Sequence, residues 1–301
     1  MAATSVTVLL WASAFVAIRD AAPHFRPGAL ALGRLLVACV VLGAILIVRR
    51  EPLPARGAWP GIAVCGVLWF GVYMVALNAG ERDVDAGTAA MIIQISPVLI
   101  ALGAAWRLRE PLRGRLVAGM VVSFAGTAVV AAAQSQAGGS ITGVLLCALA
   151  AVSYTIAMLV QKVALGHASA LSITAWSCFV GALACLPFAG QLISDTSSAP
   201  AGALFDVVYL GIGPTAIAFT TWAYALARTT AGALGATTYI VPALVILLSW
   251  LLLGEVPTSL AVAGGTLCVA GVAVARSRDH GGRAGKVAPD RSAVRSGAGT
   301  P

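Results

Sequence analysis

The chain has few charged residues and few of the side chains that metal and catalytic sites require. Only 10% of its 301 residues are Asp, Glu, Lys or Arg, and it contains three histidines. A typical soluble domain carries about 25% charged residues, so this composition does not provide a water-exposed surface. The shortage of charge excludes a water-soluble enzyme and a nucleic-acid-binding protein, and we expect no nucleic acid among its partners.

The six cysteines form no recognisable site. All lie inside apolar stretches, and no two have the CxxC spacing of zinc or redox sites. We interpret them as small buried hydrophobic residues. The histidines fall in predicted loops, at His24, His167 and His280. The sequence therefore predicts no metal, no cofactor and no catalytic residue.

Apolar residues are abundant, at 59% of the chain. A bilayer core about 30 Å thick needs roughly 20 apolar residues in a helix, and charges and turn signals divide the chain into ten such stretches. The first has no basic residue before it, which favours a membrane span over a signal peptide. We therefore predict an all-α integral membrane protein of ten transmembrane helices in a lipid bilayer, with spans at 5–18, 28–48, 57–80, 86–106, 116–133, 141–161, 169–190, 207–227, 229–254 and 256–275.

Basic residues are concentrated in alternate loops. With a cytoplasmic N-terminus, fifteen Lys and Arg residues fall on the cytoplasmic side and three on the other. This bias predicts that both termini are cytoplasmic. Residues 277–301 are predicted to be a disordered basic tail. The excess of Arg over Lys is typical of a GC-rich bacterial gene, so we expect a multi-pass protein of a bacterial cell (plasma) membrane.

The second half of the chain repeats the first. An offset of 145 residues superimposes matching features without a gap across about 45 residues, and an offset of 143 matches residues near the start of each half; these predict two five-helix repeats at 1–133 and 140–276. Because five is odd, the second repeat is inverted in the membrane, an arrangement typical of secondary transporters that expose one central site to each side in turn. The matches are Trp11 with Tyr154, Ala86-Gly87 with Ala231-Gly232, Pro97 with Pro242, and Glu110 with Glu255.

Several of these motifs resemble a known family. The segment Trp11-Ala-Ser-Ala-Phe-Val-Ala-Ile-Arg19, together with Arg34 and with Pro97 followed thirteen residues later by Glu110, is similar to the EamA-type transporters of the drug/metabolite transporter (DMT) superfamily. The resemblance covers residues 4 to about 276. It implies ten helices, cytoplasmic termini and export of amino acids, related small metabolites or drugs, with a substrate that varies widely within the family.

The two matched prolines indicate where a substrate binds. Pro97 and Pro242 lie midway along spans four and nine, where each removes a hydrogen bond from the carbonyl four residues earlier. Such breaks normally face protein or a polar cavity. Gln94 and Tyr239 stand beside the two freed carbonyls, so we predict that both bind substrate; the alternative is that they bond neighbouring helices.

Other polar and aromatic side chains are further candidates. The rings of Trp11 and Tyr154 either stack on a substrate or pack within the protein. Arg34, the one charge inside a predicted span, either reaches the outer interface, as long basic side chains often do, or binds substrate. Weaker substrate-binding candidates are Tyr73, Asn78 and Thr221.

Acidic residues are absent from the middle of every predicted span. The related small multidrug-resistance exporters use a carboxylate in their first helix to exchange protons for cations, and residues 6–18 contain none. Proton coupling by that mechanism is therefore not expected, and facilitated diffusion has equal weight. Glu81, Asp83 and Asp85 are assigned to a solvated outer loop, and Glu110 and Glu255 to caps at the starts of spans five and ten.

The preferred interpretation is a secondary transporter that exports amino acids or related metabolites by alternating access. A drug or multidrug exporter of the same fold is the main alternative. A channel is disfavoured because the chain has no filter motif, and a membrane-embedded enzyme because it has no nucleophile with a base and no paired carboxylates in a span. A homodimer is one possible assembly.

Overall fold

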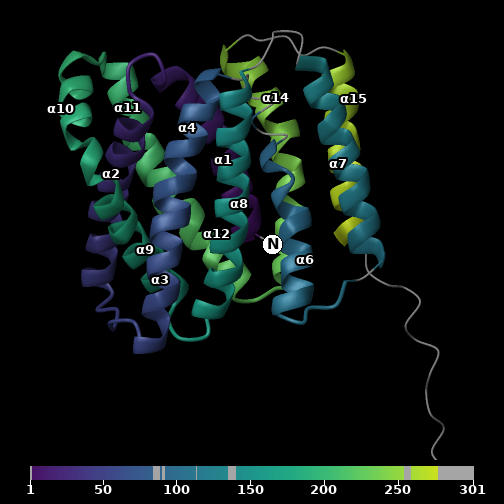
Figure 1. Ribbon diagram of the computed structural model, residues 1–301, viewed down its shortest axis with the longest axis horizontal. Coiled ribbons are helices and arrows are strands. Elements are labelled where there is room, and N and C mark those ends of the chain that lie inside the picture. The colour runs from purple at the N-terminus through teal and green to yellow at the C-terminus, as the bar shows by residue number, and fades with distance from the viewer. Residues whose placement is uncertain are drawn as a thin grey trace, which may run out of the picture.

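The protein is a bundle of roughly parallel helices (Figure 1). The structure is a computed structural model and describes residues 2–83, 89, 92–112, 114–134, 140–253 and 259–276. Within these ranges every regular element is helical. Seven helical runs are long and apolar enough to cross a membrane, and α7 and α15 contain shorter apolar helices at Gly114–Gly126 and Val262–Ala275. These findings confirm the prediction of an all-α, multi-span protein. Glu255, Asp85 and the predicted tail lie outside the described residues.

The first half of the chain begins with two uninterrupted helices. A longer run, Arg56–Asp83, follows, in which four helical segments join without a break, and we call it the first composite rod. Two more helices complete this half. In chain order the elements are α1 (Ala2–Ala21), α2 (Pro27–Val48), η1 (Arg56–Ala58), α3 (Trp59–Cys65), η2 (Gly66–Tyr73), α4 (Met74–Asp83), α6 (Ser96–Arg107) and α7 (Gly114–Gln134).

The second half has the same plan, and its composite rod is the continuous helical run Ala201–Leu226. Its elements are α8 (Ile141–Ala164), α9 (Ala170–Cys185), η3 (Leu186–Phe188), α10 (Ala189–Ser198), α11 (Ala201–Leu210), η4 (Gly211–Ile217), α12 (Ala218–Leu226), α13 (Ala231–Gly235), η5 (Ala236–Ile240), α14 (Val241–Leu253) and α15 (Ser259–Arg276).

The inverted repeat is visible in the packing of the composite rods. Both contain a π-helical segment, and these begin 145 residues apart at Gly66 and Gly211. A Cβ atom on either glycine would lie 2.8 Å from a backbone oxygen of the helix it packs against. Those oxygens belong to Ser177 of α9 and Arg34 of α2, which are 143 residues apart. Each half therefore supplies the same close contact to the other half.

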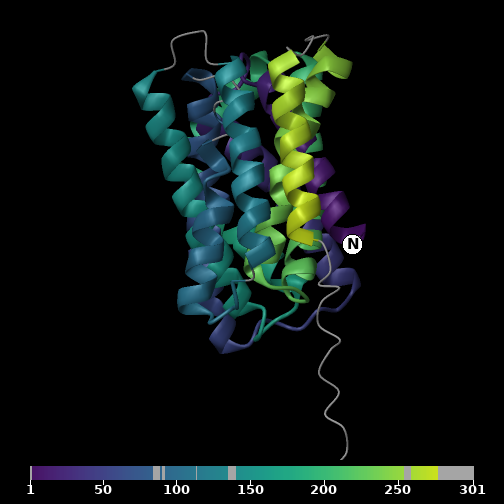
Figure 2. The same ribbon diagram turned by 90° about the vertical axis from the view of Figure 1, so that its right-hand side faces the viewer.

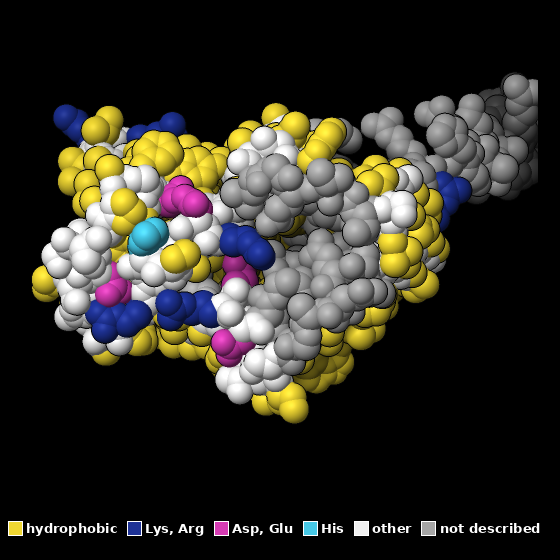
Figure 3. Space-filling model, turned by 90° about the horizontal axis from the view of Figure 1, so that it is seen from above, with side chains coloured by type: hydrophobic (Ala, Val, Ile, Leu, Met, Phe, Trp, Pro, Cys, Tyr) yellow, Lys and Arg dark blue, Asp and Glu magenta, His cyan; other side chains and the backbone are white. Residues whose placement is uncertain are grey.

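The sides of the bundle are apolar and its ends are polar. Large hydrophobic side chains point outward along the helices, including Val40 (73% exposed) and Trp106 (85% exposed). We call the end where α1 meets α2 the upper end and the opposite end the lower end. Seen from above, charged side chains gather on the upper end while yellow apolar atoms surround it (Figure 3). This distribution fits a protein whose flanks face lipid.

Charge differs between the two ends. Among the described residues, the upper end holds three basic side chains, Arg19, Arg26 and Arg82. The basic side chains at helix ends and loops of the lower end are Arg49, Arg50, Arg56, Arg107, Arg109, Arg115, Lys162 and Arg228.

Helices α7 and α15 pack against each other at one edge of the bundle, as both views show (Figures 1 and 2). The main hydrophobic core lies in the rest of the bundle, where α2, α8, α9 and the two composite rods meet. The edge pair supports the helix breaks around α6 and η5 and leaves the centre to the other helices.

Candidate substrate site

A cavity of about 70 Å³ lies at the centre of the bundle, where both repeats meet. It lies in the middle and upper part of the molecule. Its walls come from α1, α2, the two composite rods, α8 and the two helix-break segments. The lining residues are Trp11, Ala14, Phe15, Ile18, Arg34, Trp69, Tyr73, Met74, Leu77, Ile93, Gln94, Tyr154, Phe219, Thr238 and Val241.

Aromatic rings form much of the cavity wall. Trp11 lies 5.4 Å from Phe219 and 6.4 Å from Tyr154 between ring centroids, and Trp69 lies 5.0 Å from both Phe219 and Tyr154. Tyr73 completes the group at 6.0 Å from Tyr154. These rings pack on one another and also face the cavity. The two roles considered for Trp11 and Tyr154, packing within the protein and stacking on a substrate, are therefore both compatible with this geometry.

The hydroxyl group of Tyr154 adds a polar atom to this apolar wall. It is buried and has no hydrogen-bond partner in the described part of the chain. Buried polar groups normally have a partner. The tyrosine therefore offers a donor and an acceptor to a molecule in the cavity.

Arg34 points into the cavity and not to the membrane surface. It is only 5% exposed, and its Nε atom donates a hydrogen bond of 3.0 Å to the hydroxyl of Thr215. Thr215 in turn donates to the carbonyl of Leu210 at 2.7 Å. The wide π-helical turn of η4, which contains Pro214, places this threonine opposite α2. The expectation that Arg34 reaches the outer interface is thus wrong.

Gln94 and the second helix break meet directly. The Gln94 Nε2 atom donates to the carbonyl of Thr238 at 2.7 Å. That carbonyl lies four residues before Pro242, so it is the group that the proline deprives of a helical hydrogen bond. Gln94 therefore bridges the two breaks, and Gln94 and Thr238 both line the cavity.

Tyr239 lies elsewhere, although the repeat makes it equivalent to Gln94. It is fully buried against Ala101, Leu116 and Met120, in a cluster that α15 also joins. The second break is wound as the 3₁₀ segment η5, which advances about 120° per residue instead of 100°. This winding turns Tyr239 toward α6 and α7 and leaves Thr238 at the cavity.

Two weaker candidates also lie outside the cavity lining. Asn78 donates from Nδ2 to the carbonyl of Pro27 at 3.1 Å, which ties α4 to the start of α2. Thr221 shares a 2.8 Å hydrogen bond with the hydroxyl of Thr7 and so faces α1. Their polar groups connect helices.

Trp69, Phe219 and Thr238 line the cavity and were missing from the sequence-based candidates. Trp69 lies one helical turn before Tyr73, and Thr238 is adjacent to Tyr239. A search for residues at helical spacing from the candidates would have found the tryptophan.

Below the cavity the bundle is closed. The closure consists of apolar side chains without exposed surface, contributed by α6, α8, α12 and α13. Gln161 of α8, which also has no exposed surface, has no partner for either amide atom among the described residues. The closing side chains are Ile100, Met158, Trp222, Leu226 and Ala231.

Two charged groups tether the turn between α12 and α13 at this lower end. The Glu110 carboxylate accepts hydrogen bonds from the backbone N–H groups of Ala231 and Gly232, at 3.0 and 3.3 Å. The Lys162 ammonium donates to the carbonyls of Leu226 and Thr229 at 2.7 and 2.5 Å. Glu110 was expected to cap the start of its own span, but it caps α13 of the other repeat.

At the upper end, Glu81 departs from its assignment to a solvated loop. Helix α4 continues to Asp83 and includes it. The Oε1 atom of Glu81 is enclosed and has no hydrogen-bond partner in the described part of the protein. Asp83, two residues later, is exposed.

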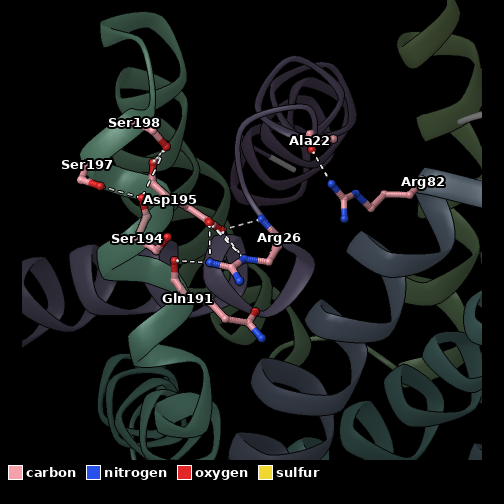
Figure 4. A network of polar contacts seen from close by, with 8 residues as sticks. All are labelled: Ala22, Arg26, Arg82, Gln191, Ser194, Asp195, Ser197 and Ser198. Atoms are coloured by element: carbon pink, nitrogen blue, oxygen red, sulfur yellow. Dashed lines mark hydrogen bonds and ion pairs between the residues drawn. The ribbon is translucent and has the colours of Figure 1, made fainter.

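A separate polar network ties the periphery of the upper end together (Figure 4). The Arg26 guanidinium donates to Asp195 of α10, with the closest contact at 2.7 Å, and also to the carbonyl of Gln191. Arg82 donates to the carbonyl of Ala22 at 3.2 Å. These bonds hold the turn between α1 and α2 against its neighbours.

Sequence comparison identifies relatives along the whole bundle. A model of the EamA-like transporter family matches residues 2–132 and 141–277. A probable terminal-alkyne amino-acid exporter of Streptantibioticus cattleyicolor is 36% identical over 95% of this chain and 96% of its own length. The aromatic amino acid exporter YddG of Ancylobacter novellus is 29% identical over 89% of this chain and 93% of its own length.

The fold has a solved counterpart. One crystal structure superimposes with a TM-score of 0.73 at 25% sequence identity, and the match covers 91% of this chain and 95% of the other.

Proposed function

Because the chain belongs to the EamA-like transporter family, we propose that it exports neutral amino acids with an apolar side chain, and that the central cavity is its substrate site. This membership agrees with the resemblance seen in the sequence motifs. The observation that carries the proposal is the composition of the cavity, with aromatic walls around a single buried arginine.

Each part of the cavity has a counterpart in such a substrate. Arginine binds carboxylates through parallel N–H donors, and only the Nε atom of Arg34 is used by a described group of the protein. The rings of Trp11, Trp69 and Tyr154 suit an apolar or aromatic side chain. Gln94 and the Tyr154 hydroxyl supply further polar contacts. A positive charge in the cavity disfavours cationic drugs, the main alternative class of substrate.

The closed lower end supports an alternating-access mechanism. The cavity extends upward from the centre, while the lower end is sealed by packed side chains and by the Glu110 and Lys162 tethers. In an inverted repeat the two ends exchange these roles, so that one site opens to each side in turn. We infer that export requires a second state in which the lower closure opens.

The distribution of charge supports an orientation. The lower end carries most of the described basic side chains, and basic loops are retained on the cytoplasmic side. We propose that the lower end and both termini are cytoplasmic in the plasma membrane of a bacterium. The cavity then faces the outside in this structure.

Counterflow in proteoliposomes tests the proposal. Vesicles are loaded with unlabelled amino acid, and uptake of labelled L-phenylalanine, L-leucine or L-propargylglycine is followed, with L-lysine and a cationic dye as comparison substrates. We expect saturable exchange of the neutral apolar amino acids, reduced by Gln94→Ala and retained in Tyr239→Phe, whose ring lies outside the cavity. Exchange of the dye without any amino acid would replace the proposal with a drug exporter.

A further inference from the structure

Glu81 has one enclosed carboxyl oxygen without a partner among the described residues, on the helix that lines the proposed substrate site. Its Oε1 atom is enclosed by protein and accepts no hydrogen bond from the described residues. A buried polar atom without a partner is uncommon and calls for an explanation. The proposed cavity lies along the same helix, which makes a ligand group the natural partner.

The register of α4 directs Glu81 toward the cavity. Tyr73, Met74 and Leu77 line it, and at about 100° per residue they span an arc of roughly 100° around the helix. Glu81 falls at about 80° from Tyr73, inside that arc and one turn above Leu77. The carboxyl group therefore stands over the upper part of the cavity.

Arg34 supplies the opposite charge from another wall. The positive charges of Arg19 and, to a smaller extent, Arg34 act on Glu81, and the described residues form no ion pair between Arg34 and Glu81. The Nε atom of Arg34 is held by Thr215, which fixes the guanidinium on α2. Arg34 thus lines the cavity from α2, and Glu81 lies one turn above the lining residues of α4.

We propose that Glu81 binds the amino group of the transported substrate while Arg34 binds its carboxylate, so that the site selects zwitterionic amino acids over other carboxylic acids of the same shape. This proposal rests on the proposed function of the cavity. An ammonium group would satisfy the enclosed carboxylate oxygen through charge-assisted hydrogen bonds. A hydroxyl group in the same position would provide a weaker partner.

The test compares L-phenylalanine with L-phenyllactate, which carries a hydroxyl group in place of the amino group. Binding of each to the purified full-length protein is measured by ligand-induced thermal stabilisation, for wild type, Glu81→Gln and Asp83→Asn. The Asp83 variant is the matched control, because it removes the same charge from an exposed position two residues away. We expect Glu81→Gln to weaken phenylalanine binding at least tenfold, to change phenyllactate binding less than twofold, and Asp83→Asn to change neither.

Other outcomes distinguish a failure of the proposed function from a failure of the role proposed for Glu81. If wild-type protein neither binds nor exchanges any amino acid, the proposed function fails. If it does, but Glu81→Gln leaves the ratio of the two affinities unchanged, only the role of Glu81 fails. Normal phenylalanine binding with a loss of acceleration by a pH gradient would make Glu81 a proton carrier and also overturn the proposal. Should Glu81→Gln not fold, Glu81→Asp retains the charge on a shorter side chain and should lower the same ratio by a smaller factor.

Discussion

At the centre of the bundle, the upper half and the lower half are built from repeat-equivalent residues that pack differently. Above the centre, α1 and α4 leave space along their inner faces, and the cavity occupies it. Below the centre, three of their four repeat equivalents on α8 and α12 have no exposed surface and do not line the cavity, while the fourth, Phe219, still lines it. The pairs are Phe15 with Met158, Ile18 with Gln161, Met74 with Phe219, and Leu77 with Trp222.

The asymmetry between the upper half, which contains the cavity, and the closed lower half therefore comes from conformation as well as from side-chain identity. Two of the four pairs, Phe15 with Met158 and Met74 with Phe219, are apolar on both sides, and either half has the composition to pack tightly there. The other two pairs differ, because both amide atoms of Gln161 and the indole Nε1 atom of Trp222 are enclosed in the closed half without a hydrogen-bond partner among the described residues. The closed lower end therefore contains a built-in destabilising group.

The largest effect on amino-acid exchange should come from replacing Arg34, which has no charged equivalent in the second repeat. Arg34 is equivalent to Ser177 under the 143-residue offset. Removing one partner of a buried charged contact costs about 2–5 kcal/mol, so we expect Arg34→Met to reduce amino-acid exchange by about thirtyfold or more. The melting temperature should not fall, because the variant also removes a buried charge. Arg82→Met, at the exposed upper rim, is the control; equal losses in both variants would contradict a special role for Arg34.

A second prediction concerns the tether at the lower end. Glu110 is charged and accepts from two backbone N–H groups of α13, and such bonds contribute about 1.5–3 kcal/mol. We expect Glu110→Gln to loosen the turn between α12 and α13, with amide hydrogen exchange at Ala231 and Gly232 rising tenfold or more. Hydrogen–deuterium exchange by mass spectrometry measures this directly.

The control for the tether is Glu51→Gln, which removes a carboxylate elsewhere at the lower end. Glu51 lies in the loop between α2 and η1 and accepts a hydrogen bond from the hydroxyl of Ser169, at the start of α9. Exchange in α13 should therefore keep its wild-type rate. If both variants raise exchange equally, the effect is one of net charge and the tether is not responsible.

A third prediction concerns Gln161 and its apolar repeat equivalent, Ile18. Gln161→Leu removes two buried amide atoms that have no partner in the described structure, and relief of such a group is worth about 1–3 kcal/mol. We expect a higher melting temperature and amino-acid exchange slowed by about tenfold, because the closed lower end becomes harder to open. In contrast, Ile18→Gln places an amide at the cavity, where water can solvate it, and should change stability less. Faster exchange in Gln161→Leu would contradict this reasoning.

The sequence predicts the helical bundle better than the individual contacts around the cavity. Hydrophobic run lengths predict the spans because bilayer thickness constrains them, and the odd number of spans in each repeat predicts the inverted halves. Pro97 and Pro242 mark two helix breaks, and in the structure Gln94 beside the first bonds the Thr238 carbonyl of the second. Tyr239 was placed wrongly at the cavity, since the repeat offset does not reveal that η5 is wound as a 3₁₀ helix.

Glu81 shows a different limit. Its neighbours Arg82 and Asp83 make the sequence look like a solvated loop, and no local pattern reveals that α4 continues through it. The enclosure of its Oε1 atom depends on the helices packed around α4. Such burial is a property of tertiary packing, which hydropathy along one segment does not contain.

The smallest effect is expected at the upper periphery, where the two halves also touch. Hydrogen bonding to Asp195 raises the pKa of Arg26 above its ordinary value, so the arginine stays charged throughout the working range and the pair is lost only when acid protonates the carboxylate. The pair is exposed to solvent, which screens it, and its residues do not line the cavity. We therefore expect Asp195→Asn to change amino-acid exchange less than twofold at neutral pH. A larger loss would mean that α10 moves with the turn between α1 and α2 during transport, and the comparison of upper and lower halves would then have to include this peripheral contact.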